Sequence, residues 1–308
     1  MRKSIKISKK KSVLGGYVKV VHGGVAFFDS GIGGLTVLAA CRKHFPREYF
    51  YYYGDNRHAP YGNLDSKKIR RYVLSAFDKF QHLEVKAAVV ACNTVTALCI
   101  EELRERYSFP IIGAEPAVLT AARRGGEVWV LTTRATYNSA RFISLCARAQ
   151  EKYPKSIIKP IACDCLAGVI EANIQDKDFN YTLALPQGNP NSVVLGCTHY
   201  IYIKEKIRSF YGCDVLDGNE GIAKRLCAVL NKSSVGLEKK GVKIGKKSVL
   251  SESVGMNDHS VTTMSKNANE CSCFYGQMNS AQVQGENIVF LGKSKGKNNK
   301  LYKQMFVF

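Results

Sequence analysis

Two segments of the sequence share the same residue pattern, and this pattern constrains the fold more than any other feature. Residues 87–94 and 192–199 each begin with an apolar run, pass through a cysteine and continue into a hydroxyl or amide residue. An apolar run bounded in this way indicates a buried strand, and the residues that follow begin a helical pattern. The sequence therefore predicts that Cys92 and Cys197 each lie where a strand ends and a helix begins.

Apolar runs of the same kind recur along the chain and alternate with stretches of helical spacing. After the first cysteine, for example, Val95, Leu98 and Leu103 would share one face of a helix. This alternation is typical of an α/β fold with a largely parallel, buried sheet, in which ligands bind beyond the carboxyl ends of the strands. The predicted strands are residues 25–28, 49–53, 87–91, 110–112, 127–131, 156–161, 192–195, 213–216 and 288–291.

The matched cysteine segments predict two similar, flavodoxin-like lobes with an active site in the cleft between them. Beyond them lies a stretch rich in Ser, Asn, Gly and Lys without a sustained period, which is typical of a poorly ordered insertion. We expect the chain to divide into a disordered basic arm at 1–22, lobe 1 at 23–115, lobe 2 at 116–212, a return to lobe 1 at 213–232, the insertion at 233–286, and a closing strand and helix at 287–308.

The chain carries a formal net charge of +20, and most of this excess lies outside the part predicted to form the lobes. Residues 1–24 contribute seven basic side chains and no acidic ones, and residues 233–308 contribute a surplus of six. Basic tails of this kind favour weak contact with polyanions such as nucleic acids. No helix-turn-helix, zinc-finger or aromatic RNA-reading motif accompanies them, so nucleic-acid binding is not predicted as the main function.

The sequence also bears on the cellular compartment. No apolar run approaches the roughly 20 residues that span a bilayer, and residues 12–21 are too broken by Gly and Lys to form a signal peptide. The 11 cysteines are scattered and odd in number, unlike a secreted disulfide scaffold. We therefore expect a cytoplasmic protein with free thiols. Two Cys-x-Cys pairs, Cys163/Cys165 and Cys271/Cys273, lack the spacing and the histidines of zinc sites, so no metal site is predicted.

Two thiols that face each other across a cleft suit one kind of chemistry. One can remove a proton from one face of a carbon while the other returns a proton to the opposite face, which is a racemisation or an epimerisation. A cysteine is a base only as the thiolate, and a helix N-terminus lowers the pKa of a thiol. We expect this effect at Cys92 and Cys197, with Asn93 and Thr198 as helix caps. The alternative for either cysteine alone is an inert buried thiol.

Other polar residues accompany the cysteines at predicted strand ends. His199 follows the second cysteine segment and could supply a proton or a positive charge that favours a thiolate. Asp29 opens a glycine-rich turn, residues 29–34, whose backbone N–H groups could hold a carboxylate. This turn matches neither the dinucleotide fingerprint nor the phosphate loop. Further candidates are Tyr61 and Gly62 in a loop, Thr133 and Thr136 after a strand, and Glu171 in a helix, where an exposed carboxylate without a function is the competing interpretation.

Taken together, these motifs resemble the glutamate racemases, which are cofactor-independent enzymes of the aspartate/glutamate racemase superfamily. The resemblance covers residues 25–231, and residues 287–308 are similar to the closing strand and helix of that family. It is carried, in family order, by residues 28–34, 54–55 with 60–62, 91–94, 115–117, 133 with 136, and 195–200.

The resemblance implies interconversion of L- and D-glutamate without pyridoxal phosphate or any other cofactor, with Cys92 and Cys197 as the acid/base pair. Asp29, His199 and Glu171 would assist the thiols. The implied substrate-binding residues are Asp29, Ser30, Tyr61, Gly62, Asn93, Thr94, Thr133, Thr136, Thr198 and His199. The resemblance also implies a bacterial cytoplasmic enzyme that supplies D-glutamate for peptidoglycan, and a homodimer is one expected state.

The chain departs from the family pattern in two regions. The usual Asp-Thr-Ala-Arg before Pro-Tyr-Gly is Asp55-Asn56-Arg57-His58-Ala59 here, and Asp164 and Gly168 stand where prolines are expected near Glu171. Two alternatives therefore accompany the main prediction: a racemase of another amino acid, such as aspartate, or a non-catalytic nucleic-acid-binding protein on the same scaffold. His199 favours glutamate by resemblance, because aspartate-type relatives tend to carry Glu at that position.

Overall fold

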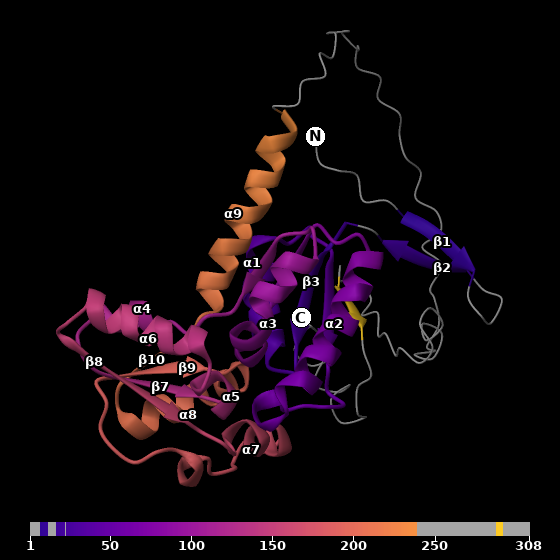
Figure 1. The fold of residues 1–308 in the computed structure, drawn as a ribbon. Helices are drawn as coiled ribbons and strands as arrows, with labels where there is room; N and C mark the ends of the chain where they lie inside the picture. Colours follow the sequence, from indigo (N-terminus) through magenta and orange to yellow (C-terminus); the bar gives the residue numbers. More distant parts are fainter. Residues whose placement is uncertain (1–6, 12–16, 22, 239–287, 292–308) are drawn as a thin grey trace, which may run out of the picture.

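The computed structural model describes residues 7–11, 17–21, 23–238 and 288–291, and in it the chain forms two α/β lobes side by side (Figure 1). Each lobe is built on a sheet whose strands all run parallel. The predicted α/β class with two lobes is confirmed. Every predicted strand is present, and its ends differ from the prediction by no more than one residue.

Lobe 1 has, among the described residues, a five-stranded sheet in the order β11-β4-β3-β5-β6. Its strands are β3 Val25–Asp29, β4 Phe50–Gly54, β5 Ala87–Val90, β6 Ile111–Gly113 and β11 Ile288–Leu291. Its helices are α1 Gly34–His44, α2 Ser66–His82, α3 Asn93–Arg106 and α9 Asn219–Glu238, with a 3-10 turn η1 at Tyr61–Asn63.

The central strand β3 explains how helices cover both faces of this sheet. Successive side chains of a strand point to opposite faces. Val25 and Phe27 pack in one cluster with residues of α1 and α9, whereas Ala26 and Phe28 pack with residues of α2 and α3. All four side chains are fully buried. Because burying one large apolar side chain stabilises a fold by about 1.5–3 kcal/mol, the two layers fix the strand and the residues at its carboxyl end.

Lobe 2 has a four-stranded sheet in the order β10-β9-β7-β8 among the described residues. Its strands are β7 Gly126–Thr132, β8 Ser156–Ala162, β9 Ser192–Gly196 and β10 Asp214–Leu216. Its helices are α4 Val118–Ala122, α5 Arg134–Tyr137, α6 Ala140–Lys152, α7 Leu166–Asn173 and α8 Lys204–Tyr211, with 3-10 turns η2 Thr182–Ala184 and η3 Thr198–Ile203. The helices α4 and α6 pack on one face of the sheet, and α7, η3 and α8 pack on the other.

Local sequence signals set several helix ends. The Asp65 side chain accepts two backbone N–H groups in the first turn of α2, and Ser139 accepts one in the first turn of α6. Such caps satisfy donors that have no partner inside the helix. Gly212 ends α8 in the left-handed conformation, with φ of 62°, which favours glycine.

The structure differs from the predicted domain limits in three places. The strands β1 Ile7–Lys11 and β2 Tyr17–Val21 pair antiparallel within the arm predicted to be disordered, and β2 carries the strand-favouring tyrosine and valines of this pair. β10 pairs with β9, so lobe 2 extends beyond residue 212 and the return to lobe 1 begins at α9. α9 also continues into the predicted insertion, as far as Glu238. Residues 239–286 and the predicted closing helix lie outside the described residues.

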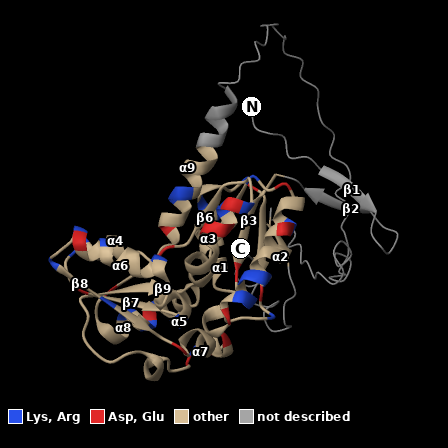
Figure 2. Cartoon of the chain, viewed as in Figure 1, with Lys and Arg blue, Asp and Glu red and all other residues tan. Residues whose placement is uncertain are grey.

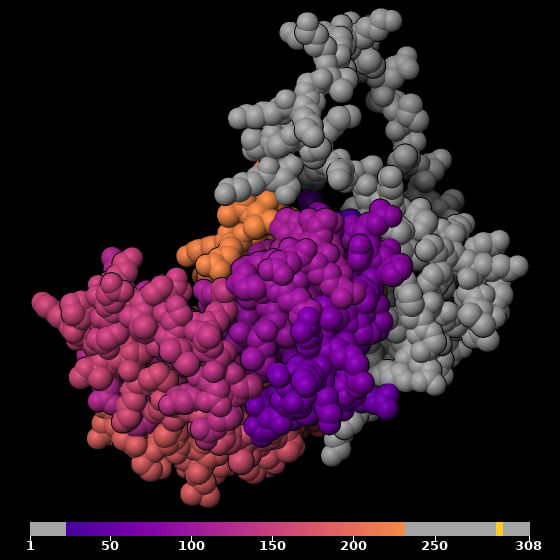
Figure 3. Space-filling view, viewed as in Figure 1, coloured from indigo at the N-terminus to yellow at the C-terminus, as the bar shows by residue number. Residues whose placement is uncertain are grey.

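The surface of the lobes shows no single dominant charge in the view drawn. Basic and acidic residues are intermixed over the helices of both lobes (Figure 2). In the space-filling view the atoms of the two lobes meet along a continuous boundary (Figure 3). Within the described residues, no helix combines the length and the apolar character that crossing a membrane requires.

Candidate active site

The two cysteines occupy matching positions in the two lobes. Cys92 follows β5 and is the N-cap residue of α3, and Cys197 follows β9 and is the N-cap residue of η3. Both thiols are free, and Cys92 is 4% exposed and Cys197 is 7% exposed. The predicted strand-to-helix positions are therefore confirmed. The predicted caps are wrong by one residue, because Asn93 and Thr198 are the first residues of their helices.

The two lobes touch directly beside the cysteines. The Thr198 hydroxyl of lobe 2 donates to Asp29 Oδ2 of lobe 1 at 3.2 Å, and the Gly31 N–H donates to Asp29 Oδ1 at 2.9 Å. The glycine turn after β3 lies against the same threonine so closely that a Cβ atom at Gly33 would collide with the Thr198 side chain. The glycine at this position is thus required by the approach of the second lobe.

The Cys92 thiol lies in a buried, acidic setting. It donates a weak hydrogen bond to Ser30 Oγ, with an S···O distance of 3.6 Å. Burial, and then the charge of Asp29, raises the pKa of the Cys92 thiol to about 12, although the Val95 N–H and the Ser30 hydroxyl oppose the shift. The expectation that the helix N-terminus would lower this pKa is therefore wrong, because desolvation outweighs the helix. A charge on Cys197 also contributes to the increase in this pKa, so the two thiols interact electrostatically.

The Cys197 thiol has a different neighbour. His199 Nδ1 lies 3.8 Å from Cys197 Sγ, and His199 Nε2 lies 3.0 Å from Glu171 Oε2. Burial alone would lower the pKa of His199, but the hydrogen bonds to Cys197 and Glu171, together with the charges of Cys197 and Asp29, raise this pKa well above 6.5. At neutral pH the site therefore holds an imidazolium beside Cys197. The contact also brings Glu171 into the site, although it lies on α7, far away in the sequence.

A second polar cluster connects the lobes near the thiols. Thr94 Oγ1 and Thr133 Oγ1 are 3.0 Å apart, and the Thr133 hydroxyl donates to Thr136 Oγ1 at 3.1 Å. All three residues are nearly fully buried. Gly62 of the η1 turn packs against Thr133, where a Cβ atom would lie 3.0 Å from the threonine side chain. These hydroxyl groups could hold an anionic group, because each can donate a hydrogen bond.

The structure thus brings most of the predicted site residues together. One connected set runs from one lobe to the other and contains Cys92, Ser30, Asp29, Thr198, Cys197, His199 and Glu171. The threonine cluster with Gly62 forms the second set. Two predicted residues use their side chains elsewhere: the Asn93 amide donates to Ala114 O at 3.4 Å, and the Tyr61 hydroxyl donates to Asp55 Oδ2 at 2.5 Å.

Sequence reasoning missed residues that hold the glycine turn after β3. The Tyr52 hydroxyl donates to Gly31 O at 2.8 Å, and the Tyr202 hydroxyl donates to Ile32 O at 2.7 Å. Their sequence positions gave no signal, because one tyrosine lies inside a strand and the other inside η3. Asp55 was also missed, although its place directly after β4 is the kind of strand end that marked the other residues.

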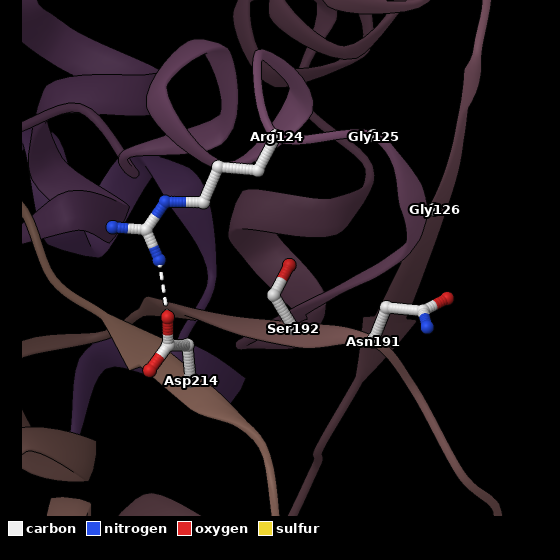
Figure 4. Close-up of a pocket in the computed structure, with 6 residues that line it drawn as sticks. All are labelled: Arg124, Gly125, Gly126, Asn191, Ser192 and Asp214. Carbon is white, nitrogen blue, oxygen red and sulfur yellow. Dashed lines mark hydrogen bonds and ion pairs between the residues drawn. The ribbon is translucent and has the colours of Figure 1, made fainter.

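A separate cavity of about 350 Å³ lies at the opposite end of the lobe 2 sheet, where its strands begin (Figure 4). It is lined by Arg124, Gly125, Gly126, Asn191, Ser192 and Asp214, none of which is a predicted site residue. The cleft residues, in contrast, are packed: 0% of Asp29 and 2% of His199 is exposed. Among the described residues, no group of three or more His, Cys, Asp or Glu could hold a metal ion.

Asp29→Asn is expected to increase stability at neutral pH. Burial raises the pKa of the Asp29 carboxyl above its ordinary value of 3.8, and hydrogen bonds and His199 offset this only in part. A raised pKa means that the folded state binds the proton more tightly than the unfolded state. The stability that protonated Asp29 contributes to the fold is complete below pH 3.8 and is lost as the pH rises through the folded pKa. Asparagine does not ionise, so the variant avoids this loss and its melting temperature at pH 7 should be higher than that of wild type.

Asp164→Asn is the matched control with the opposite sign. Arg134 holds the pKa of the Asp164 carboxyl below its ordinary value, first through its hydrogen bonds and then through its charge. Removing this carboxylate should lower the melting temperature at pH 7. Circular dichroism from pH 3 to pH 8 would measure all three proteins. An Asp29→Asn protein that melts below wild type at pH 7 would contradict the argument from burial.

The fold and the site together define a two-lobed α/β protein in which each lobe contributes one thiol to a shared, buried polar cluster. A family model described as Asp/Glu/Hydantoin racemase matches residues 36–226. The chain belongs to this family.

Individual relatives agree with this assignment. The chain is 34% identical over 221 residues to a glutamate racemase of Clostridium botulinum, a match that covers 68% of this chain and 85% of the relative. It is similar to a crystal structure of Escherichia coli glutamate racemase in complex with L-glutamate and the activator UDP-MurNAc-ala, with a TM-score of 0.62, 30% identity, and coverage of 68% and 83%. A structure of glutamate racemase from Francisella tularensis in complex with D-glutamate gives a TM-score of 0.59, 27% identity, and coverage of 70% and 83%.

Proposed function

We propose that this protein interconverts L- and D-glutamate by proton transfer between the substrate α-carbon and two thiols, without a cofactor. The observation that carries the proposal is that each lobe contributes one cysteine, Cys92 or Cys197, next to the Asp29–Thr198 contact that joins the lobes. Relatives named glutamate racemase support the choice of substrate, since two of the solved structures contain L- or D-glutamate.

The two thiols have different neighbours. The His199 imidazolium lies next to Cys197, and a neighbouring positive charge of this kind stabilises a thiolate. Cys92 is a thiol at neutral pH, since its pKa is raised to about 12 mainly by burial. Cys197 would therefore remove the α-proton of the enantiomer that presents it to lobe 2. Cys92 would protonate the carbanion from the other face and become the thiolate.

The reverse direction uses the same groups with their protons exchanged. Cys92 as thiolate removes the proton, and Cys197 as thiol returns one, so each turnover leaves the pair in the opposite state. The carbanion is a poor intermediate in water, and the site would stabilise it by fixed dipoles. Backbone N–H groups at residues 93–94 and 198–199, where α3 and η3 begin beside the thiols, would donate to the α-carboxylate, and the threonine cluster would hold the second carboxylate.

The cellular role we propose is the supply of D-glutamate for peptidoglycan in a bacterial cytoplasm. The need for two free thiols supports a reducing compartment, because oxidation would remove the acid/base pair. The homodimer and the weak contact of basic tails with nucleic acid stay predictions from the sequence.

Incubation of the full chain with L-glutamate in D₂O, without added cofactor, tests this function. Circular dichroism would follow the loss of optical rotation, and NMR would follow deuterium entering at the α-carbon. We expect both signals to change together until the mixture is racemic. Aspartate, alanine and glutamine, supplied as L-enantiomers, are the comparison substrates. Turnover of aspartate but not glutamate, or salt-sensitive DNA binding without any α-proton exchange, would overturn the proposal.

A further inference from the structure

His58 occupies a tight turn directly after β4, in the segment where the chain departs from its family pattern. The His58 N–H donates to Asp55 O at 3.0 Å, which closes the turn. The ring then folds back, and its Nδ1 atom lies 2.9 Å and 2.8 Å from the two carboxylate oxygens of Asp55. A carboxylate accepts hydrogen bonds only, so the imidazole must carry a proton on Nδ1 in this contact.

Asp55 links His58 to the Tyr61 hydroxyl. That hydroxyl donates to Asp55 Oδ2 at 2.5 Å, and only 1% of Tyr61 is exposed. Burial, and then the charge and the hydrogen bond of Asp55, raises the pKa of Tyr61, so the hydroxyl stays protonated and continues to donate. The three side chains therefore form one line of hydrogen bonds, from a half-buried imidazole at the surface to a buried phenol.

A stacking contact fixes the outer end of this line. The His58 ring lies parallel to the Tyr72 ring of α2, with centroids 3.9 Å apart and planes 7° apart. On the same helix, Lys79 also interacts electrostatically with Asp55, but its ammonium group lies over the Tyr53 ring, 4.8 Å from the centroid. His58 is thus the basic side chain that bonds Asp55 within the described residues.

The inner end of the line, Tyr61, belongs to the turn that packs against the threonine cluster proposed to hold the second carboxylate of glutamate. Tyr61 begins η1, and the next residue, Gly62, packs against Thr133 of lobe 2. Asn63, the last residue of η1, donates to Asp164 O of lobe 2 at 3.1 Å. A shift of the Tyr61 ring would move this turn, and with it the spacing between Gly62 and the threonine cluster.

We propose that His58 is a positioning residue for glutamate: through Asp55 and Tyr61 it holds the η1 turn against the threonine cluster that receives the substrate carboxylate. The inference rests on the proposed function, because it concerns glutamate binding at the same site. It assigns His58 no contact with substrate and no part in proton transfer. Its loss should therefore weaken glutamate binding and leave the thiol chemistry intact.

Two substitutions at this position separate the hydrogen bond from the ring. His58→Phe keeps a flat ring for stacking on Tyr72 and removes the Nδ1 donor. His58→Asn removes the ring but puts an amide N–H₂ at the place of Nδ1. We expect His58→Phe to raise KM for glutamate about tenfold, as loss of a hydrogen bond to a charged group would, with kcat within about twofold of wild type. His58→Asn should restore KM to within about threefold of wild type.

A double-mutant cycle tests the connection to Tyr61. If both residues act through Asp55, His58→Phe combined with Tyr61→Phe should raise KM little more than the larger single effect, because linked residues are not additive. His44→Phe on α1, whose imidazole Nε2 lies 3.5 Å from the exposed Glu220 carboxylate, is the matched surface control and should keep the wild-type KM. Melting temperatures confirm that each protein is folded.

The outcomes separate this inference from the proposed function. A wild-type protein without glutamate turnover rejects the proposed function first. With an active wild type, an unchanged KM in His58→Phe, an equal defect in His58→Phe and His58→Asn, or multiplying effects in the double mutant would each overturn the positioning role. A fall in kcat at unchanged KM would also overturn it, since it would place His58 in the proton transfer.

Discussion

Alanine in place of either cleft cysteine should abolish the racemisation of glutamate. We expect Cys92→Ala and Cys197→Ala each to lower kcat by at least about 10³-fold, because a positioned acid or base contributes roughly 10²–10⁴-fold and inversion needs both groups. Each cysteine contacts a different partner, Ser30 or His199, so neither thiol can take the place of the other. Circular dichroism with L- and with D-glutamate would measure the loss.

The Cys92→Ala variant should nevertheless retain one half of the reaction. Cys197, beside the His199 imidazolium, can still take the α-proton of the enantiomer that it faces and return a solvent proton to the same side. In D₂O, Cys92→Ala should therefore exchange the α-proton of one enantiomer of glutamate without forming the other. Cys197→Ala should show little exchange at neutral pH, because the pKa of the remaining Cys92 thiol is raised to about 12, mainly by burial. Proton NMR on each enantiomer separately gives this readout. Inversion by either variant at a rate near wild type would contradict the two-thiol mechanism.

A third cysteine provides the matched control. Cys146 on α6 is also free and buried, and burial raises the pKa of its thiol to about 12, as it does mainly at Cys92. It packs with Phe142 and Leu145 on the far side of the lobe 2 sheet, in a cluster that contains neither cleft thiol. Cys146→Ala should cost stability through the lost packing, but it should keep the wild-type kcat. Loss of turnover in this variant would point to a general effect on folding.

The positions of the elements were readable from the sequence because they depend on local patterns. Apolar runs such as residues 127–131 end at Gly, Pro or hydroxyl residues, and the strands end there in the structure. The same rule placed both cysteines and Asp29 at carboxyl ends of parallel strands, where the two lobes meet. β10 was placed in the wrong lobe because it is a three-residue edge strand, and nothing in so short a segment says which sheet it joins.

The electrostatics of the site could not be read in the same way. The sequence shows that Cys92 begins a helix, but it does not show how deeply the second lobe buries this thiol, and that burial decides the direction of its pKa shift. The contact between Glu171 and His199 depends on the packing of α7 on η3, which is a long-range feature. The line from His58 through Asp55 to Tyr61 depends on side-chain directions in one turn, and a residue pattern does not specify these.

Replacement of His199 should lower catalysis strongly and equally in both directions. For His199→Asn we expect kcat/KM to fall about 10²-fold, since the variant loses the positive charge that supports the Cys197 thiolate. The two enantiomers have the same free energy in water, so the equilibrium constant is one and kcat/KM for L- and D-glutamate must stay equal in any variant. The values of kcat and KM separately are free to differ. Initial rates with each enantiomer measure all four constants.

The pH dependence of the same variant gives an independent readout. Hydrogen bonds to Cys197 and Glu171 overcome the effect of burial and raise the pKa of His199 well above 6.5. The stability that this group contributes is therefore complete below pH 6.5 and is lost as the pH rises through the folded pKa. Wild-type kcat/KM should hold across neutral pH and fall at alkaline pH, together with the free energy of unfolding. In His199→Asn the alkaline fall that depends on this imidazolium should be absent from both kcat/KM and the free energy of unfolding. His44→Asn, on the surface of α1, should keep it. Identical alkaline profiles in wild type and His199→Asn would show that the imidazolium does not support the Cys197 thiolate.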